Sequence, residues 1–180
     1  ITITTMILIG YSTIKNENKI KATNPLPKAS WDIKIGSSAQ EELKKTITLT
    51  DGSLLSIGNT KNKTPNGDLT NTGKGEKDAL IIKMGMTSYD KIFGGTKQDE
   101  YKDVIETYDG GFIAVGYTAS PTGGDITDTN KGGELDALVV KYDASGNKVW
   151  DKLIGGNGTD KFESIIKIGS GAEEKYIIAG

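Results

Sequence analysis

The sequence of 180 residues contains no cysteine, no histidine and no arginine, so lysine supplies all of its positively charged side chains. Without cysteine and histidine the chain cannot build a Ser-His-Asp or Cys-His nucleophile, or a zinc site of thiolate and imidazole ligands. Without arginine it lacks the bidentate clamp for phosphate and carboxylate groups. Carboxylates, lysine and tyrosine remain available for catalysis, so these absences lower the expectation of an enzyme without excluding one.

The overall composition is that of an ordinary globular protein. Hydrophobic residues make up 35% of the chain and charged residues 26%, and the net charge is −2. Lysine and acidic residues are interspersed, and no basic stretch is present that would follow a nucleic-acid backbone. We therefore predict no nucleic-acid partner, and we note that a chain without cysteine suits export.

Three aromatic residues mark a tandem repeat: Trp31, Tyr89 and Trp150 follow one another at spacings of 58 and 61 residues. A glycine lies five residues after each of them. Next comes an alternating apolar segment that passes through a Gly-rich turn into a returning strand, as in "KDVIETYDGGFIAVGYT" over 102–118. Alternation with period two around an Asp-Gly turn is typical of a β-hairpin. The chain is thus expected to repeat one hairpin module.

A polar, Gly-rich stretch over 61–77 or 119–135 follows the hairpin, and an apolar strand, "DALIIKM" or "DALVVKY", comes after it. The stretch has turn composition, and the strand is expected to be buried on both faces. Each unit of about 60 residues then holds four antiparallel strands, as in the blades of a propeller. We predict an all-β, β-propeller-like fold in which the aromatic anchors pack between neighbouring blades; the alternative is that their rings are exposed to stack on sugar.

The repeat divides the chain into blade repeat 1 over 31–88, blade repeat 2 over 89–149 and a partial blade repeat 3 over 150–180. A propeller typically needs about four to eight blades, so we expect an incomplete ring. Either the chain is a piece of a longer one, which we favour, or copies associate to complete the ring. Residues 1–30 are interpreted as a truncated secretion signal, with a degenerate upstream blade as the alternative.

The run "DALVVKYDASGNKVWDKLIGGNGTDKFESIIKI", together with "TYDGGFIAVGYTAS", resembles the tandem repeats of bacterial surface and secreted proteins. The similarity covers 31–180 and is strongest in the second unit. It implies a β-propeller-like exported protein, for which most relatives have no assigned activity. The segment "YDASGNKVW" is also similar to the blade signature of quinone-dependent dehydrogenase propellers and their noncatalytic scaffold relatives. The cofactor ligands of those dehydrogenases do not map onto this chain, so the resemblance implies no catalytic residue and no cofactor.

Acidic residues in the loops supply the candidates for metal binding and catalysis. The best calcium candidate is "GDITDTNKGGELD", with Asp125, Asp128 and Asp136 as the main ligands and Asn130 and Glu134 beside them, because calcium prefers several oxygen ligands in a flexible loop. The alternative, which we favour, is a solvated loop with turn-forming Asp and Asn residues. Two acidic pairs, Asp99–Glu100 and Asp160–Glu163, have the residue types of a glycosidase, although turn chemistry explains them better.

These observations lead to three functional hypotheses. The first is a noncatalytic protein, exported to the cell surface or the extracellular space, whose loops bind a protein or glycan partner in adhesion. The second is a scaffold subunit of a surface assembly, in which blade edges or faces meet a fixed partner. The third is a hydrolase or lyase that uses carboxylates. We predict no cofactor, no bound metal and no membrane-spanning segment.

Overall fold

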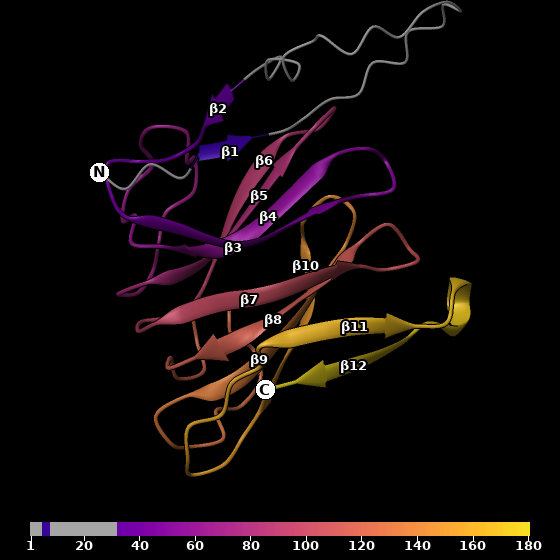
Figure 1. Ribbon diagram of the computed structural model, residues 1–180. Helices are drawn as coiled ribbons and strands as arrows, with labels where there is room; N and C mark the ends of the chain where they lie inside the picture. Colours follow the sequence, from indigo (N-terminus) through magenta and orange to yellow (C-terminus); the bar gives the residue numbers. More distant parts are fainter. Residues whose placement is uncertain (1–4, 8–31) are drawn as a thin grey trace, which may run out of the picture.

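The computed structural model describes residues 5–7 and 32–180 and places two four-stranded sheets one after the other along the chain (Figure 1). Sheet 1 contains, in spatial order, β3 (Glu41–Thr48), β4 (Leu54–Thr60), β5 (Asp78–Met84) and β6 (Tyr89–Phe93). Sheet 2 contains β7 (Asp99–Glu106), β8 (Phe112–Thr118), β9 (Asp136–Tyr142) and β10 (Lys148–Ile154).

Two smaller elements accompany the sheets. A hairpin of β11 (Ser164–Ile168) and β12 (Lys175–Ala179), joined through a 3-10 turn at Gly171–Glu173, follows sheet 2. Before sheet 1, β1 (Thr5–Ile7) pairs with β2 (Asp32–Lys34). The remaining part of residues 1–30, for which a secretion signal or an upstream blade is predicted, lies outside the described residues, as does Trp31.

Every strand pair is antiparallel, and the 3-10 turn is the one helical element among the described residues. The predictions of an all-β fold and of four-stranded antiparallel sheets are therefore confirmed. The sheets of the described part form no closed ring (Figure 1). Within residues 5–7 and 32–180, no helix has the length and apolar character needed to cross a membrane.

The sheets are out of phase with the sequence repeat. The strand that begins at the anchor Tyr89 pairs with β5 of the preceding unit, and the strand that holds Trp150 pairs with β9 in the same way. Each anchor strand thus completes the sheet of the unit before it. Sequence spacing gives the period of such a repeat but not the point at which one sheet ends and the next begins.

One glycine in each sheet is required by a β-bulge. The ladder between β7 and β8 shifts between Tyr101 and Asp103, and Gly116 lies opposite Tyr101. A Cβ atom on Gly116 would overlap the carbonyl oxygen of Glu100. Sheet 1 repeats this arrangement, with Gly58 opposite the bulge of β3. The glycine that follows the apolar residues of each returning strand therefore has a steric cause.

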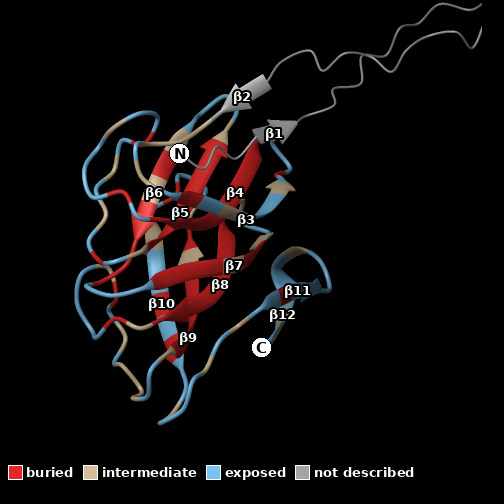
Figure 2. Ribbon diagram, turned by 60° about the vertical axis from the view of Figure 1, so that its left-hand side comes forward, coloured by how far each residue is buried: buried red, intermediate tan, exposed pale blue. Residues whose placement is uncertain are grey.

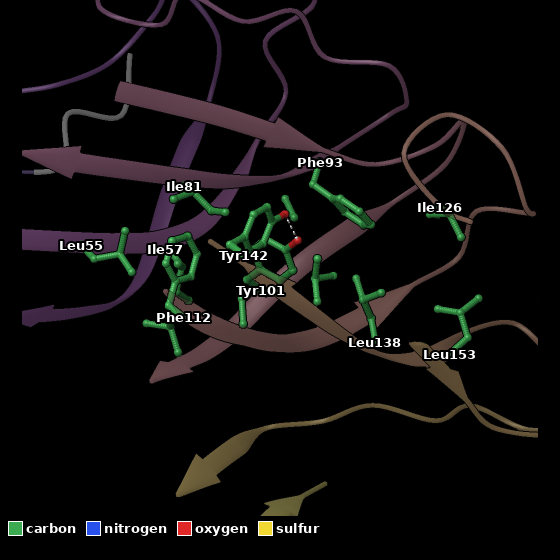
Figure 3. Close-up of a cluster of buried hydrophobic side chains, with 14 of the residues drawn as sticks. Leu55, Ile57, Ile81, Phe93, Tyr101, Phe112, Ile126, Leu138, Tyr142 and Leu153 are labelled. Carbon is green, nitrogen blue, oxygen red and sulfur yellow. Dashed lines mark hydrogen bonds between the residues drawn. The ribbon is translucent and has the colours of Figure 1, made fainter. Parts of the chain in front are cut away.

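The main core lies between the two sheets (Figure 3). It combines side chains of both, including Leu55, Ile57 and Ile81 from sheet 1 and Phe112 and Leu138 from sheet 2. Figure 2 shows that the central strands are the most buried. The two "DAL" strands, β5 and β9, are buried along nearly their whole length, as predicted. Each fully buried side chain of this kind stabilises the fold by about 1.5–3 kcal/mol.

The two described anchors differ in burial. Tyr89 packs against the main core beneath the turn at Gly146, and burial raises its pKa to about 12, with contributions from nearby carboxylates. Trp150 is 44% exposed, so the prediction that its ring is buried between blades is wrong for the described residues. The physical reason is that Trp150 lies on the face of sheet 2 that carries the β11–β12 hairpin, where it lines an open groove together with Tyr176 and Ile178.

Candidate functional site

The long loops of the chain come together at one edge of the stacked sheets (Figure 1). The amide of Asp68 donates to the carbonyl of Gly36, that of Asp125 donates to Gly94 at 3.0 Å, and that of Glu134 donates to Gly158. Each long loop is thereby joined to the glycine-containing segment that follows an anchor strand. We call residues 61–77, 94–98, 119–135 and 155–163 the loop edge.

A buried carboxylate on β6 fixes the first long loop. Asp90 accepts hydrogen bonds from the backbone amides of Thr70 at 3.0 Å and Asn71 at 3.1 Å, and from both of their side chains. Burial alone would raise the pKa of Asp90, but these hydrogen bonds outweigh burial and lower it below its ordinary value. The ionised carboxylate is therefore part of the folded structure of the loop.

The second long loop is fixed in the same way from β10. Asp151 accepts from the amides of Thr127 and Asp128, each at 2.9 Å, from the Thr127 hydroxyl, and from the Lys148 ammonium at 2.5 Å. Burial opposes ionisation here too, yet the bonds from Lys148 and Thr127 lower the pKa of Asp151. A buried aspartate on the last strand of the sheet thus holds the long loop in both repeats.

A second pair of buried carboxylates surrounds Gly94. Asp78 accepts from the amides of Lys74 and Gly75, and Asp99 accepts from the Gly95 amide at 2.9 Å and from two hydroxyl groups of the β8 end, Thr118 and Ser120. Burial raises the pKa of both acids, and the charge of Asp78 adds to the rise for Asp99. A side chain at Gly94 would overlap both carboxylates.

The predicted calcium ligands are distributed among different bonds. Asp125 pairs with Lys74 and accepts from the Gly94 amide, and Asp128 accepts from the Leu153 amide at 2.8 Å, which is the main reason why its pKa falls to about 2. The buried Asp136 accepts from the Lys131 amide at 2.8 Å. In the part of the chain that the structure describes, no three acidic side chains come close enough to hold a metal ion.

Asn130 and Glu134, the other two candidate calcium ligands, also have separate surroundings. The carboxamide oxygen of Asn130 accepts from the Gly132 amide at 2.9 Å, and Glu134 is exposed to solvent. In this structure the Asn130 side chain takes part in a turn, and Asp128 attaches the loop to β10.

Three of the four acids considered for glycoside hydrolysis, Asp99, Glu100 and Asp160, have side-chain contacts in this structure. Asp99 and Glu100 are successive strand residues whose side chains point to opposite faces of sheet 2. Burial would raise the pKa of Glu100, but Lys102 and Lys77, with N–O distances of 2.5 Å, lower it to about 2. In the other pair, Asp160 accepts from the Gly156 amide at 3.0 Å and Glu163 is exposed.

Sequence reasoning did not single out Asp90 and Asp151, which hold the loops in place. Their signal is present in the sequence: an aspartate follows each anchor directly, as in Tyr89-Asp90 and Trp150-Asp151. Because the anchor side chain faces one side of its strand, the next residue faces the other side and reaches the loop of the same sheet.

The exposed surface of the loop edge is polar. Its long loops present mainly threonine and lysine side chains, and neither 61–77 nor 119–135 contains an aromatic residue. The ion pair between Lys74 and Asp125 connects the two loops across the boundary between the sheets.

Comparison of the chain with protein-family models and with curated protein sequences finds no match.

Proposed function

We propose that the chain is a noncatalytic, exported repeat protein of β-propeller-like construction whose loop edge binds a protein or glycan partner. The observation that carries this proposal is the repeated attachment of each long loop to a buried aspartate, Asp90 in sheet 1 and Asp151 in sheet 2. A loop that is fixed before binding loses less conformational entropy when a partner arrives. Such preorganised loops on a rigid sheet scaffold are a common place for recognition.

The chemistry of the loop edge favours a polar protein surface over a glycan as the partner. Sugar-binding sites commonly use an aromatic ring as a stacking platform, because a ring offers a large apolar face. The two long loops offer none, so a glycan would be held by hydrogen bonds alone. Exposed lysines such as Lys61, Lys63 and Lys97 would instead pair with acidic side chains of a protein.

Binding to cells and to a glycan array tests the proposal. The test variant replaces exposed side chains of both loops with alanine, at Lys61, Lys63, Thr72 and Thr129, and leaves the residues that contact Asp90 and Asp151 unchanged. We expect this variant to keep its thermal stability and to lose the binding signal.

A matched control carries exposed substitutions in the turns at the opposite edge, at Met86, Thr87, Ala144 and Ser145. Binding should persist in this control. Binding by the loop variant at the level of the parent protein would contradict the proposal. A signal on the glycan array would show that the partner is a glycan and not a protein.

A scaffold subunit is the second candidate, favoured by a different observation. The β11–β12 hairpin exposes Ile166, Ile168 and Ile177 on one face, and an apolar face of this kind suits contact with another protein module. This role would survive the loop substitutions and fail on substitution of the isoleucines, so the two candidates are distinguishable.

A further inference from the structure

Three equivalent cross-strand pairs differ in what covers them. Ile47 lies opposite Leu55 in sheet 1, Ile105 lies opposite Ile113 in sheet 2, and Ile166 lies opposite Ile177 in the β11–β12 hairpin. The first two pairs pack against the next unit along the chain. In the third, the side chains are 53% and 51% exposed.

The strand β12 corresponds to β4 and β8. Gly180, directly after β12, would overlap the carbonyl oxygen of Lys161 if it carried a Cβ atom, as Gly58 and Gly116 would overlap Glu42 and Glu100. Strands β4 and β8 are paired along both edges, and each has a "DAL" strand on its second edge. Among the described residues, β12 pairs with β11 alone.

An apolar groove runs beside this open edge. It has a volume of about 380 Å³ and is lined by Val139 and Trp150 from sheet 2 and by Tyr176 and Ile178 from β12, among others. At the boundary between sheets 1 and 2, the corresponding space is filled by alternate residues of β9, which are fully buried or nearly so: Leu138, Val140 and Tyr142.

We propose that the outer edge of β12 and this groove bind an extended segment of the type Asp-Ala-Leu-apolar-apolar-Lys, which adds to the hairpin as an antiparallel strand. The chain itself forms this contact twice, β4 with β5 and β8 with β9, in the same register and with the same sequence type. Strand addition of this kind obtains affinity from main-chain hydrogen bonds and specificity from alternate side chains.

The internal repeat also fixes the expected register. In sheet 2, Phe112 lies opposite Tyr142 and Gly116 lies opposite Leu138. A peptide with the sequence of 136–142 would therefore place its tyrosine opposite Tyr176 and its leucine opposite Gly180. Its leucine, second valine and tyrosine would enter the groove, and its first valine and lysine would face away from it.

An extended segment fits this place better than other ligands. The open edge of β12 offers backbone donors and acceptors that only another extended backbone can satisfy in series. A helix satisfies its own backbone groups, and a small apolar molecule has none to offer. The groove next to the edge supplies the apolar contacts that give an isolated strand its register.

Trp150 provides a direct readout of binding. In the Trp31→Phe variant it is the single tryptophan of the chain, and it lines the groove. Titration with a peptide of sequence 136–142, extended by lysines for solubility, should give a saturable blue shift of the tryptophan emission. A peptide of sequence 78–84 should do the same.

Changes confined to the peptide test the geometry without risk to the fold of the protein. Aspartate in place of the leucine and second valine, which enter the groove, should weaken binding at least about tenfold. Threonine in place of the first valine, which faces away, should change it less than about threefold. On the protein, Ile178→Asp should weaken binding and the matched Ile177→Asp, on the opposite face, should not.

Backbone methylation separates strand addition from simple apolar binding. Alternate amides of an added strand point toward β12, so one N-methylated set should abolish binding and the other should be tolerated. Tolerance of both sets, or no saturable change in Trp150 emission, would overturn the proposal. A concentration-dependent shift of the emission without peptide would show that a second copy of the chain occupies the groove, and would overturn the assignment of the occupant.

Discussion

The hydroxyl oxygens of Tyr101 and Tyr142 lie 2.6 Å apart in the core between the two sheets. Both rings are buried, and they meet edge to face with their centroids 6.4 Å apart. Burial is the main cause that raises the pKa of each hydroxyl above its ordinary value, so both remain protonated. Each hydroxyl thus depends on the other for its hydrogen bond within an otherwise apolar core.

A double-mutant cycle on this pair should show strong coupling. Tyr142→Phe leaves the Tyr101 hydroxyl without this partner and should lower the free energy of unfolding by about 1–3 kcal/mol. Tyr101→Phe should do the same. The double variant should cost less than the sum of the two, because neither buried hydroxyl then remains. Additive losses in urea denaturation would contradict the pairing.

Replacement of Asp151 by asparagine should release the 119–135 loop. An asparagine keeps the shape of the side chain but loses the charge that holds two amides, a hydroxyl and Lys148. We expect a loss of about 1–3 kcal/mol in stability and faster hydrogen exchange at the amides of Thr127 and Asp128. Asp143→Asn, in a turn at the opposite edge, is the control and should leave exchange in the loop unchanged. Equal exchange in all three proteins would show that the aspartate does not hold the loop.

Replacement of Gly116 by alanine should destabilise sheet 2. The added methyl group would overlap the carbonyl oxygen of Glu100 at the bulge. Overpacking of this kind costs about 1–3 kcal/mol or more. Gly156→Ala is the matched control, because a Cβ there meets nothing within 4 Å. Similar melting temperatures for the two variants would be inconsistent with the bulge geometry.

Acid should weaken the boundary between the sheets through Glu100. Its pKa in the folded protein is about 2, below the ordinary value of 4.5, so its stabilising effect is fully present above about pH 4.5 and is lost as the pH falls toward 2. A pKa difference of one unit corresponds to about 1.4 kcal/mol, so the shift of Glu100 corresponds to an effect of roughly 3 kcal/mol.

The variant Glu100→Gln should therefore be less stable than the parent protein at neutral pH, and the difference should shrink between pH 4.5 and pH 2. The exposed Glu163→Gln serves as the control and should follow the parent curve. A stability difference that stays constant with pH would argue against an ionised Glu100 in the folded state.

The sequence allowed the strands to be predicted because their signals are local. The alternation around the Asp-Gly turn at 109–110 and the apolar "DAL" runs each determine a strand without reference to the rest of the chain, and the structure contains both. The sheet boundaries were not predictable in this way. Whether Tyr89 pairs forward or backward along the chain depends on contacts between distant segments.

The candidate site was less predictable for a related reason. Asp125 and Asp128 accept from the amides of Gly94 and Leu153, which lie outside the 119–135 loop, whereas Asp136 accepts from the amide of Lys131 within it. The loop is instead organised by Asp151, which is 23 residues from the Asp128 amide that it accepts from. Spacing within a loop carries no information about such a long-range partner.

Zero-length cross-linking with mass spectrometry is the most direct test of whether the two sheets stack with their long loops side by side. We expect carboxylate-to-lysine cross-links between the sheets at two ion pairs, Lys74–Asp125 and Lys45–Asp103. The charged atoms of the second pair lie 3.7 Å apart. The Lys167–Glu174 pair within the hairpin, at 2.7 Å, is the internal control. Recovery of the hairpin cross-link without either cross-link between the sheets would contradict the stacked arrangement.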